Sequence, residues 1–140
     1  MAGSSADATP GAGAADPRFR RGAALFDAEA WFEAHEVWED QWRVSTGEDR
    51  LLLQALIQAA AALHHARRGN AVGARHLRDA AGAKLARLGA ERFGVDLRAF
   101  ADALTARLRA LDDAASPPAP PPRLRLADPG PVPSDPGTRR

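Results

Sequence analysis

Two ionisable side chains lie one helical turn apart in a tryptophan-rich part of the sequence. His35 and Glu39 are four residues apart, so a helix would place both on one face. The three tryptophans of the chain, Trp31, Trp38 and Trp42, share that face, which we expect to point into the core. A carboxylate in a dry environment is costly unless it is paired or hydrogen-bonded, so we expect its partner on a neighbouring helix.

The next helical stretch offers these partners. At 100° of rotation per residue, Gln54, His64 and Arg68 fall within the arc that faces the first helix, and Gln58 and His65 lie at its edge. We therefore expect one polar cluster built from His35, Glu39 and this second set.

Three interpretations of the cluster remain open. In the first, it is an internal hydrogen-bonded network that fixes helix register and needs no cofactor. In the second, His35, Glu39 and His64 bind a divalent metal with an open position, and Glu36 is the candidate catalytic base. In the third, the cluster binds a ligand without metal. The sequence around His35 has Glu39 where the His-Glu-x-x-His zinc motif requires histidine, and no Glu-x-x-His di-iron pattern occurs.

Composition excludes other chemistries. The chain has 140 residues, the length of one domain, and contains no cysteine and no tyrosine. Without cysteine there is no disulfide, thiolate nucleophile or Cys-ligated metal. The Gly-x-Ser-x-Gly motif and the common nucleotide-binding glycine loops are also absent. No apolar run resembles a signal peptide or a membrane span, so we expect a cytoplasmic protein without a membrane partner.

Helices must position the cluster. Alanine is abundant, β-branched residues are scarce, and no stretch alternates with a period of two. Caps and breakers, among them Asp16-Pro17, Gly69-Asn70 and Asp96, divide the chain. The sequence predicts an all-α bundle of about five helices built from helical hairpins, at residues 17–28, 30–44, 48–68, 71–88 and 97–114.

The two ends of the chain differ from this helical region, residues 17–115. Residues 1–16 are small and polar and predict a disordered tail. Residues 116–140 are rich in proline, which favours a free, extended tail. The alternative is that Leu124 and Leu126 dock on the domain as a short extended piece.

Charge divides the helical region into two parts. Residues 27–49 contain eight acids and one base, a net charge of −7, whereas residues 50–92 contain eight bases and two acids, a net charge of +6. We expect the two parts to face each other, so the basic part does not predict nucleic-acid binding.

Four stretches combine aromatic, acidic and histidine residues in a specific order: Phe19-x-x-Gly22-x-x-Leu25-Phe26, Trp31-Phe32-Glu33-Ala34-His35-Glu36-Val37-Trp38-Glu39-x-x-Trp42, Leu53-Gln54-Ala55-Leu56-Ile57-Gln58 and Ala61-Ala62-Leu63-His64-His65-x-x-Arg68-Gly69-Asn70. This order resembles the small bacterial and archaeal family named domain of unknown function 309, over about residues 19–88. The resemblance implies an all-α fold and no established activity.

At its motif positions, the resemblance also implies which residues matter: His35, Glu36, Glu39, Trp42, Gln54, Gln58, His64, Arg68 and Asn70. The sequence departs from the family at Asp27-Ala28-Glu29, where relatives more often have Asn and Gly in the turn. We therefore expect a less sharply bent first hairpin, or a helix that continues through Ala28 and Glu29.

Two functions are compatible with these features. The first is a non-catalytic helical module that binds an unknown protein partner or pairs with itself, with the polar cluster holding helix register. The second is a small metal-dependent hydrolase that uses His35, Glu39 and His64 as ligands.

Overall fold

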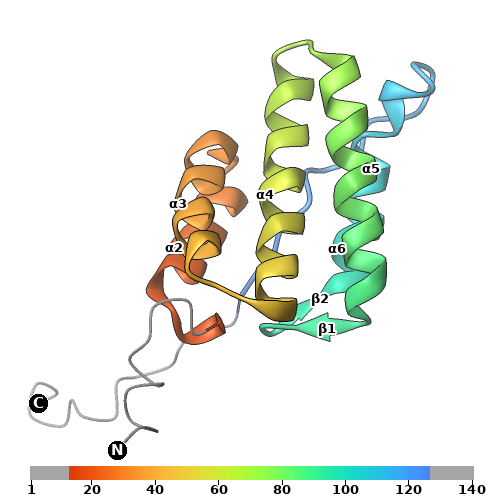
Figure 1. Cartoon of the computed structure of the whole chain (residues 1–140). Helices are drawn as coiled ribbons and strands as arrows, with labels where there is room; N and C mark the ends of the chain where they lie inside the picture. Colours follow the sequence, from red (N-terminus) through yellow and green to blue (C-terminus); the bar gives the residue numbers. More distant parts are fainter. Residues whose placement is uncertain (1–12, 127–140) are drawn as a thin grey trace, which may run out of the picture.

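The computed structural model describes residues 13–126 and confirms the all-α class. Its elements follow one another along the chain as helices joined by short turns, with one very small antiparallel hairpin (Figure 1). The elements are η1 Gly13–Ala15, α2 Pro17–Asp27, α3 Trp31–Arg43, α4 Gly47–Arg67, α5 Ala71–Leu88, β1 Glu91–Arg92, β2 Val95–Asp96, α6 Leu97–Arg107 and η2 Arg109–Leu111.

The helices form two layers. In Figure 1, α3, α4 and α5 stand side by side in front, and α2 and α6 lie behind α3 and α5. Helices that follow one another in sequence pack on one another, from α2 with α3 to α5 with α6, as expected for hairpins. Because α4 lies in the middle of the front layer, its outer side is the only one that it offers to solvent.

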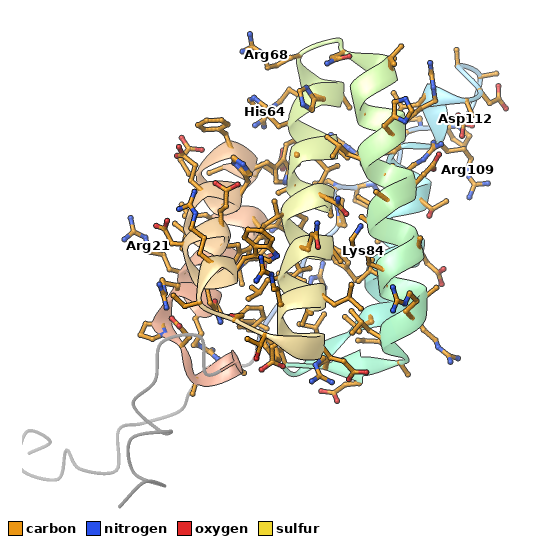
Figure 2. All side chains as sticks on the ribbon, viewed as in Figure 1. Arg21, His64, Arg68, Lys84, Arg109 and Asp112 are labelled. Atoms are coloured by element: carbon orange, nitrogen blue, oxygen red, sulfur yellow. The ribbon has the colours of Figure 1, made fainter. Side chains whose placement is uncertain are left out.

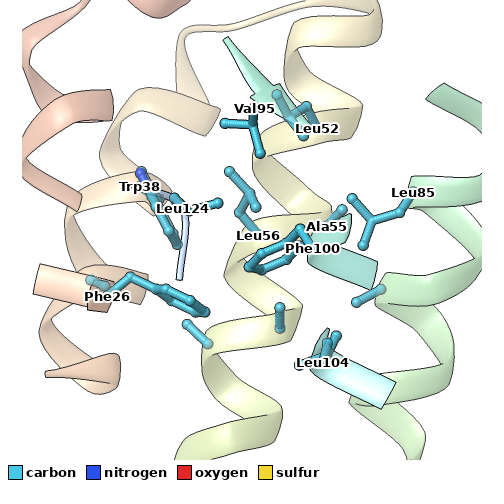
Figure 3. Packing of buried hydrophobic residues seen from close by; sticks show 14 of the residues in the cluster. Phe26, Trp38, Leu52, Ala55, Leu56, Leu85, Val95, Phe100, Leu104 and Leu124 are labelled. Atoms are coloured by element: carbon cyan, nitrogen blue, oxygen red, sulfur yellow. The ribbon is translucent and has the colours of Figure 1, made fainter. Parts of the chain in front are cut away.

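The core lies between the two layers. Figure 3 shows Phe26, Trp38, Leu56, Phe100 and Leu124 converging on the side of α4 that faces the rear layer. The ring centroids of Phe26 and Phe100 lie 5.5 Å apart. The small residues of α4 let its neighbours approach closely. Four alanines of this helix are completely buried: Ala55, Ala59, Ala60 and Ala62.

The predicted caps Asp16 and Asp96 are confirmed, and Asn70 of the predicted turn is a cap as well. Asp16 accepts a hydrogen bond from the backbone N–H of Arg18, with Pro17 as the first residue of α2. The Asn70 side chain accepts from Gly73 at the start of α5, and Asp96 accepts from Ala99 in α6.

The first turn is sharp although it lacks glycine. Helix α2 ends at Asp27, and Glu29 takes a φ of 63°, in the left-handed region that glycine and asparagine prefer. The expectation of a longer helix or a blunter hairpin is therefore wrong. The Arg67 guanidinium, which donates to the Glu29 carbonyl at 3.0 Å, helps to hold this conformation.

The last helix is shorter than predicted. Helix α6 ends at Arg107, and the chain continues as η2 rather than as helix to residue 114. Arginines of α5 draw the chain toward that helix, since Arg75 donates to the Leu111 carbonyl and Arg78 pairs with Asp112 at 2.8 Å.

The proline-rich segment after the last helix packs on the domain, so the expectation of a free tail is wrong as far as residue 126. Leu124 is 6% exposed, and the Asp27 carboxylate accepts hydrogen bonds from the backbone N–H groups of Leu124 and Arg125 at 2.7 and 2.9 Å. Arg107 also donates to the Ala119 carbonyl. The burial of one leucine and two charge-assisted hydrogen bonds offset the entropy cost of ordering this segment. That cost is small because the prolines restrict the backbone in the unfolded chain as well. Residues 127–140 lie outside the described part.

The expected N-terminal tail is also structured near its end. Residues Gly13–Ala15 form η1, and the buried amide of Gln41 donates to the Gly13 carbonyl at 3.1 Å. Residues 1–12 of that expected tail lie outside the described part.

A small hairpin between α5 and α6 was not predicted. Strands β1 and β2 pair with each other, and Phe93 and Gly94 form the turn between them. These two residues have φ values of 59° and 77°, as a tight two-residue hairpin turn requires. Phe93 packs edge-on against Phe19 at 4.9 Å. Among residues 13–126 no helix has both the length and the apolarity of a membrane span.

The acidic and basic parts of the sequence meet at one place. Arg92 pairs with Glu48 and Asp49 at the start of α4, at 2.8 and 3.1 Å. Of the other ion pairs among the described residues, none joins the acidic part to the basic part.

Candidate functional site

Most of the predicted site residues are partly exposed residues of α3 and α4. We call the surface that these residues form the α3–α4 face. Each of its side chains is half-buried except Phe32, which is 46% exposed. Its members are Phe32, His35, Glu39 and Trp42 from α3 and Gln54, Ile57, Gln58 and His64 from α4.

The buried side of α3 differs from the predicted one. Its buried residues are Trp31, Ala34, Trp38 and Gln41, and their mean direction is about 80° away from that of His35 at 100° per residue. His35 therefore lies at the rim of the core and not at its centre. Two residues account for this direction of the buried side of α3. The small Ala34 allows close packing against a neighbouring helix, and the buried Gln41 amide has a hydrogen-bond partner in η1.

His35 and Glu39 do not form the expected pair. The Glu39 carboxylate instead accepts a hydrogen bond from Arg43 at 3.3 Å, with its side chain 40% exposed. His35 Nδ1 lies 3.1 Å from the Phe32 carbonyl, and because a carbonyl only accepts, Nδ1 carries the proton in that contact.

The residues do not fit the expected metal site. Within residues 13–126, no group of three or more His, Asp or Glu side chains is arranged to hold a metal ion. The Phe32 ring contacts both imidazoles of the expected set, at 5.4 Å from His35 and 5.4 Å from His64. Glu39 pairs with Arg43 instead, so His35, Glu39 and His64 do not converge as ligands.

Several buried polar atoms without partners belong to the α3–α4 face. In the described part of the chain, five side-chain nitrogens or oxygens are shielded from solvent and lack a hydrogen bond. Three of them belong to this face: Trp42 Nε1, Gln58 Oε1 and His64 Nδ1. Because an unsatisfied buried group costs about 1–3 kcal/mol, such groups are rare unless they serve a purpose or bind water.

His64 is held neutral. Burial lowers the pKa of His64 below its ordinary value, and the positive charge of Arg68 lowers it further. One ring nitrogen of a neutral imidazole donates and the other accepts, so His64 can offer either kind of hydrogen bond to a ligand.

Two arginines of α4 cover tryptophans of α3. Arg50 lies 4.0 Å above the Trp42 ring, and Arg67 lies 4.2 Å above the Trp31 ring. These contacts tie the two ends of α4 to α3. Sequence reasoning missed both arginines and Phe32. The exposed aromatic at Phe32, one turn before Glu36, was the available signal.

The remaining predicted residues lie at the edges of this region. Glu36, the candidate base, is exposed and makes no hydrogen bond or ion pair within residues 13–126. Asn70 contacts His65 Nδ1 at 3.2 Å while it caps α5, so these two residues shape the turn. Arg68, at the C-terminus of α4, is exposed and contributes charge near His64 (Figure 2).

Comparison with known proteins agrees with the resemblance noted from the sequence. A search of curated proteins finds no match. The family model described as Domain of unknown function (DUF309) matches residues 19–77, which span α2, α3, α4 and the first turns of α5 and include every residue of the α3–α4 face. Residues 19–77 therefore belong to the family Domain of unknown function (DUF309).

Proposed function

We propose that the chain is a non-catalytic binding module that associates with a second copy of itself through the α3–α4 face. The observation that carries this proposal is the exposed ring of Phe32, which stands on His35 and His64 in a face that also holds three unpartnered buried polar atoms. An exposed aromatic side chain on a partly apolar face is a typical anchor for a protein partner.

Charge supports a second copy as that partner. Helix α3 carries exposed carboxylates outward, among them Glu33, Glu36 and Asp40, whereas α4 ends in exposed Arg67 and Arg68. In a twofold interface, both copies use the same surface, rotated by 180° relative to each other. The acidic side of one copy can therefore meet the basic side of the other. This arrangement would use the net charges of −7 and +6, which within residues 13–126 form ion pairs with each other only through Arg92.

The test is the oligomeric state of the full chain by analytical ultracentrifugation from low to high micromolar concentration. We expect a concentration-dependent dimer that Phe32→Ala weakens at least tenfold. Val72→Ala is the matched control, because Val72 is 61% exposed on α5, outside the α3–α4 face. A monomer at every concentration, or equal effects of the two variants, would refute self-association through this face.

A charge reversal tests the electrostatic part. Glu36→Lys should weaken the dimer and reduce its dependence on salt, because it removes one attractive contact with the basic side. Asp102→Lys, at an exposed position on α6 in the rear layer, makes the same change of charge away from the face. Equal weakening by both would show that net charge alone governs association.

A further inference from the structure

A pocket of about 280 Å³ lies at the end of the bundle where α3 begins and α4 and α6 end. Four of its lining side chains are large and apolar: Trp31, Leu63, Leu108 and Leu111. Arg67 and Arg107 stand at its edges, and no acidic residue lines it. The pocket shares no residue with the α3–α4 face itself, and it shares Arg67 with the basic side of the proposed dimer.

The two arginines have donors to spare. Arg67 gives one hydrogen bond to the Glu29 carbonyl at 3.0 Å, and Arg107 gives one to the Ala119 carbonyl at 2.8 Å. Neither pairs with a carboxylate anywhere in residues 13–126. Since a guanidinium has five N–H donors, both retain the charge and the geometry to bind an anion.

A third donor belongs to the same pocket. Trp31 is 1% exposed, and its Nε1 is one of the buried polar atoms without a partner. The Arg67 guanidinium lies over this indole ring, 4.2 Å from its centroid. An anion that drew Arg67 toward itself would therefore come close to the unsatisfied indole.

We propose that this pocket binds a small monocarboxylate with an apolar body. The guanidiniums of Arg67 and Arg107 would hold the carboxylate, and the leucines would enclose the apolar part. The pocket is small for a ligand site, because its volume of about 280 Å³ lies just below the range of roughly 300–1,000 Å³ that is usual for such sites. A short acyl chain fits this space, a long fatty acid does not, and inorganic phosphate leaves the apolar walls uncovered.

The test uses hexanoate as the probe and follows the three indole N–H signals of the full chain by NMR. We expect hexanoate at millimolar concentrations to shift the Trp31 signal, assigned with Trp31→Phe, and to leave that of Trp42 in place. Hexanol, with the same chain but no charge, and inorganic phosphate, with charge but no chain, should each bind at least tenfold more weakly. Hexanol binding as tightly as hexanoate would overturn the proposal, and so would a Trp31 signal that does not move.

Variants separate the pocket from the rest of the molecule. Arg107→Gln should weaken hexanoate at least tenfold, and Arg107→Lys should recover part of that loss because it keeps the charge. Ala110 is exposed at the pocket, so Ala110→Leu should block it without touching either guanidinium. Ala115→Leu, at an exposed position outside the pocket, is the matched control. Unchanged affinity in both Arg107→Gln and Ala110→Leu would place the binding elsewhere and refute the assignment.

Discussion

The packing of α3 on α2 depends on one glycine. The Trp38 indole lies against Gly22 of α2, so a Cβ added at Gly22 would meet the indole nitrogen and two indole carbons at 2.3–2.6 Å. Trp38 is completely buried beside Phe26, and its Nε1 donates to the Phe19 carbonyl at 3.2 Å. The substitution Gly22→Ala therefore has no free space to enter.

The expected cost follows from three contributions. Overpacking of a filled core costs about 1–3 kcal/mol. Displacing Trp38 breaks its hydrogen bond to Phe19, which adds about 1–3 kcal/mol if the buried groups stay unpaired. Alanine is a better helix former than glycine by about 1 kcal/mol, which offsets part of this loss. We expect Gly22→Ala to lower the free energy of unfolding by about 3 kcal/mol.

The matched control is the same substitution in α5. A Cβ at Gly82 meets no atom within 4 Å, so Gly82→Ala should raise the free energy of unfolding by about 0.5–1 kcal/mol. Urea denaturation followed by circular dichroism measures both. If Gly22→Ala leaves the free energy of unfolding unchanged, or raises it as Gly82→Ala does, Trp38 does not pack on Gly22 as described.

Three further predictions follow from single contacts. Leu124→Ala should lower the free energy of unfolding in urea by about 2–4 kcal/mol, and Leu126→Ala, at a half-buried position, by clearly less; equal losses would contradict the seating of Leu124. Burial and Arg68 lower the pKa of His64 below its ordinary value of 6.5, so the unfolded chain takes up that proton first and stability falls as the pH drops below about 6.5. The melting temperature of His64→Gln should fall less over that range, whereas the exposed-site control His76→Gln should behave as the wild type. Glu29→Gly should raise the free energy of unfolding by about 1 kcal/mol, and the melting temperature with it, because glycine adopts a φ of 63° without strain. A lower melting temperature would show that the Glu29 side chain itself is needed.

The helical hairpins were predictable where a helix boundary has a local cause. Asp16-Pro17, Gly69-Asn70 and Asp96 cap or break helices by interactions that span only a few residues. The seating of Leu124 was not predictable, because its partner Asp27 lies 97 residues away and proline content favours an extended chain in either case. The shorter α6 has a similar origin, since arginines of α5 redirect the chain after it.

The candidate site was predictable in membership more than in geometry. Trp42, Gln58 and His64 were expected to lie near one another, and all three carry unpartnered buried atoms on the α3–α4 face. A helical wheel gives relative directions, but it does not show which direction faces the core. In α3, the direction that faces the core includes Gln41, a polar residue that the sequence did not mark as buried. Gln41 is buried because the Gly13 carbonyl of η1 accepts a hydrogen bond from its amide.

The two hydrogen bonds from Leu124 and Arg125 to Asp27 also bear on the order in which parts of the domain fold. Neighbouring helices from α2 to α5 form contacts of short range, which favours their early formation during synthesis. The site for Leu124 lies beside Phe26 and Phe100, so it stays open until almost the whole described chain has been made. We therefore expect a nascent or truncated chain ending before residue 124 to expose this apolar seam, and the completed chain to close it from within.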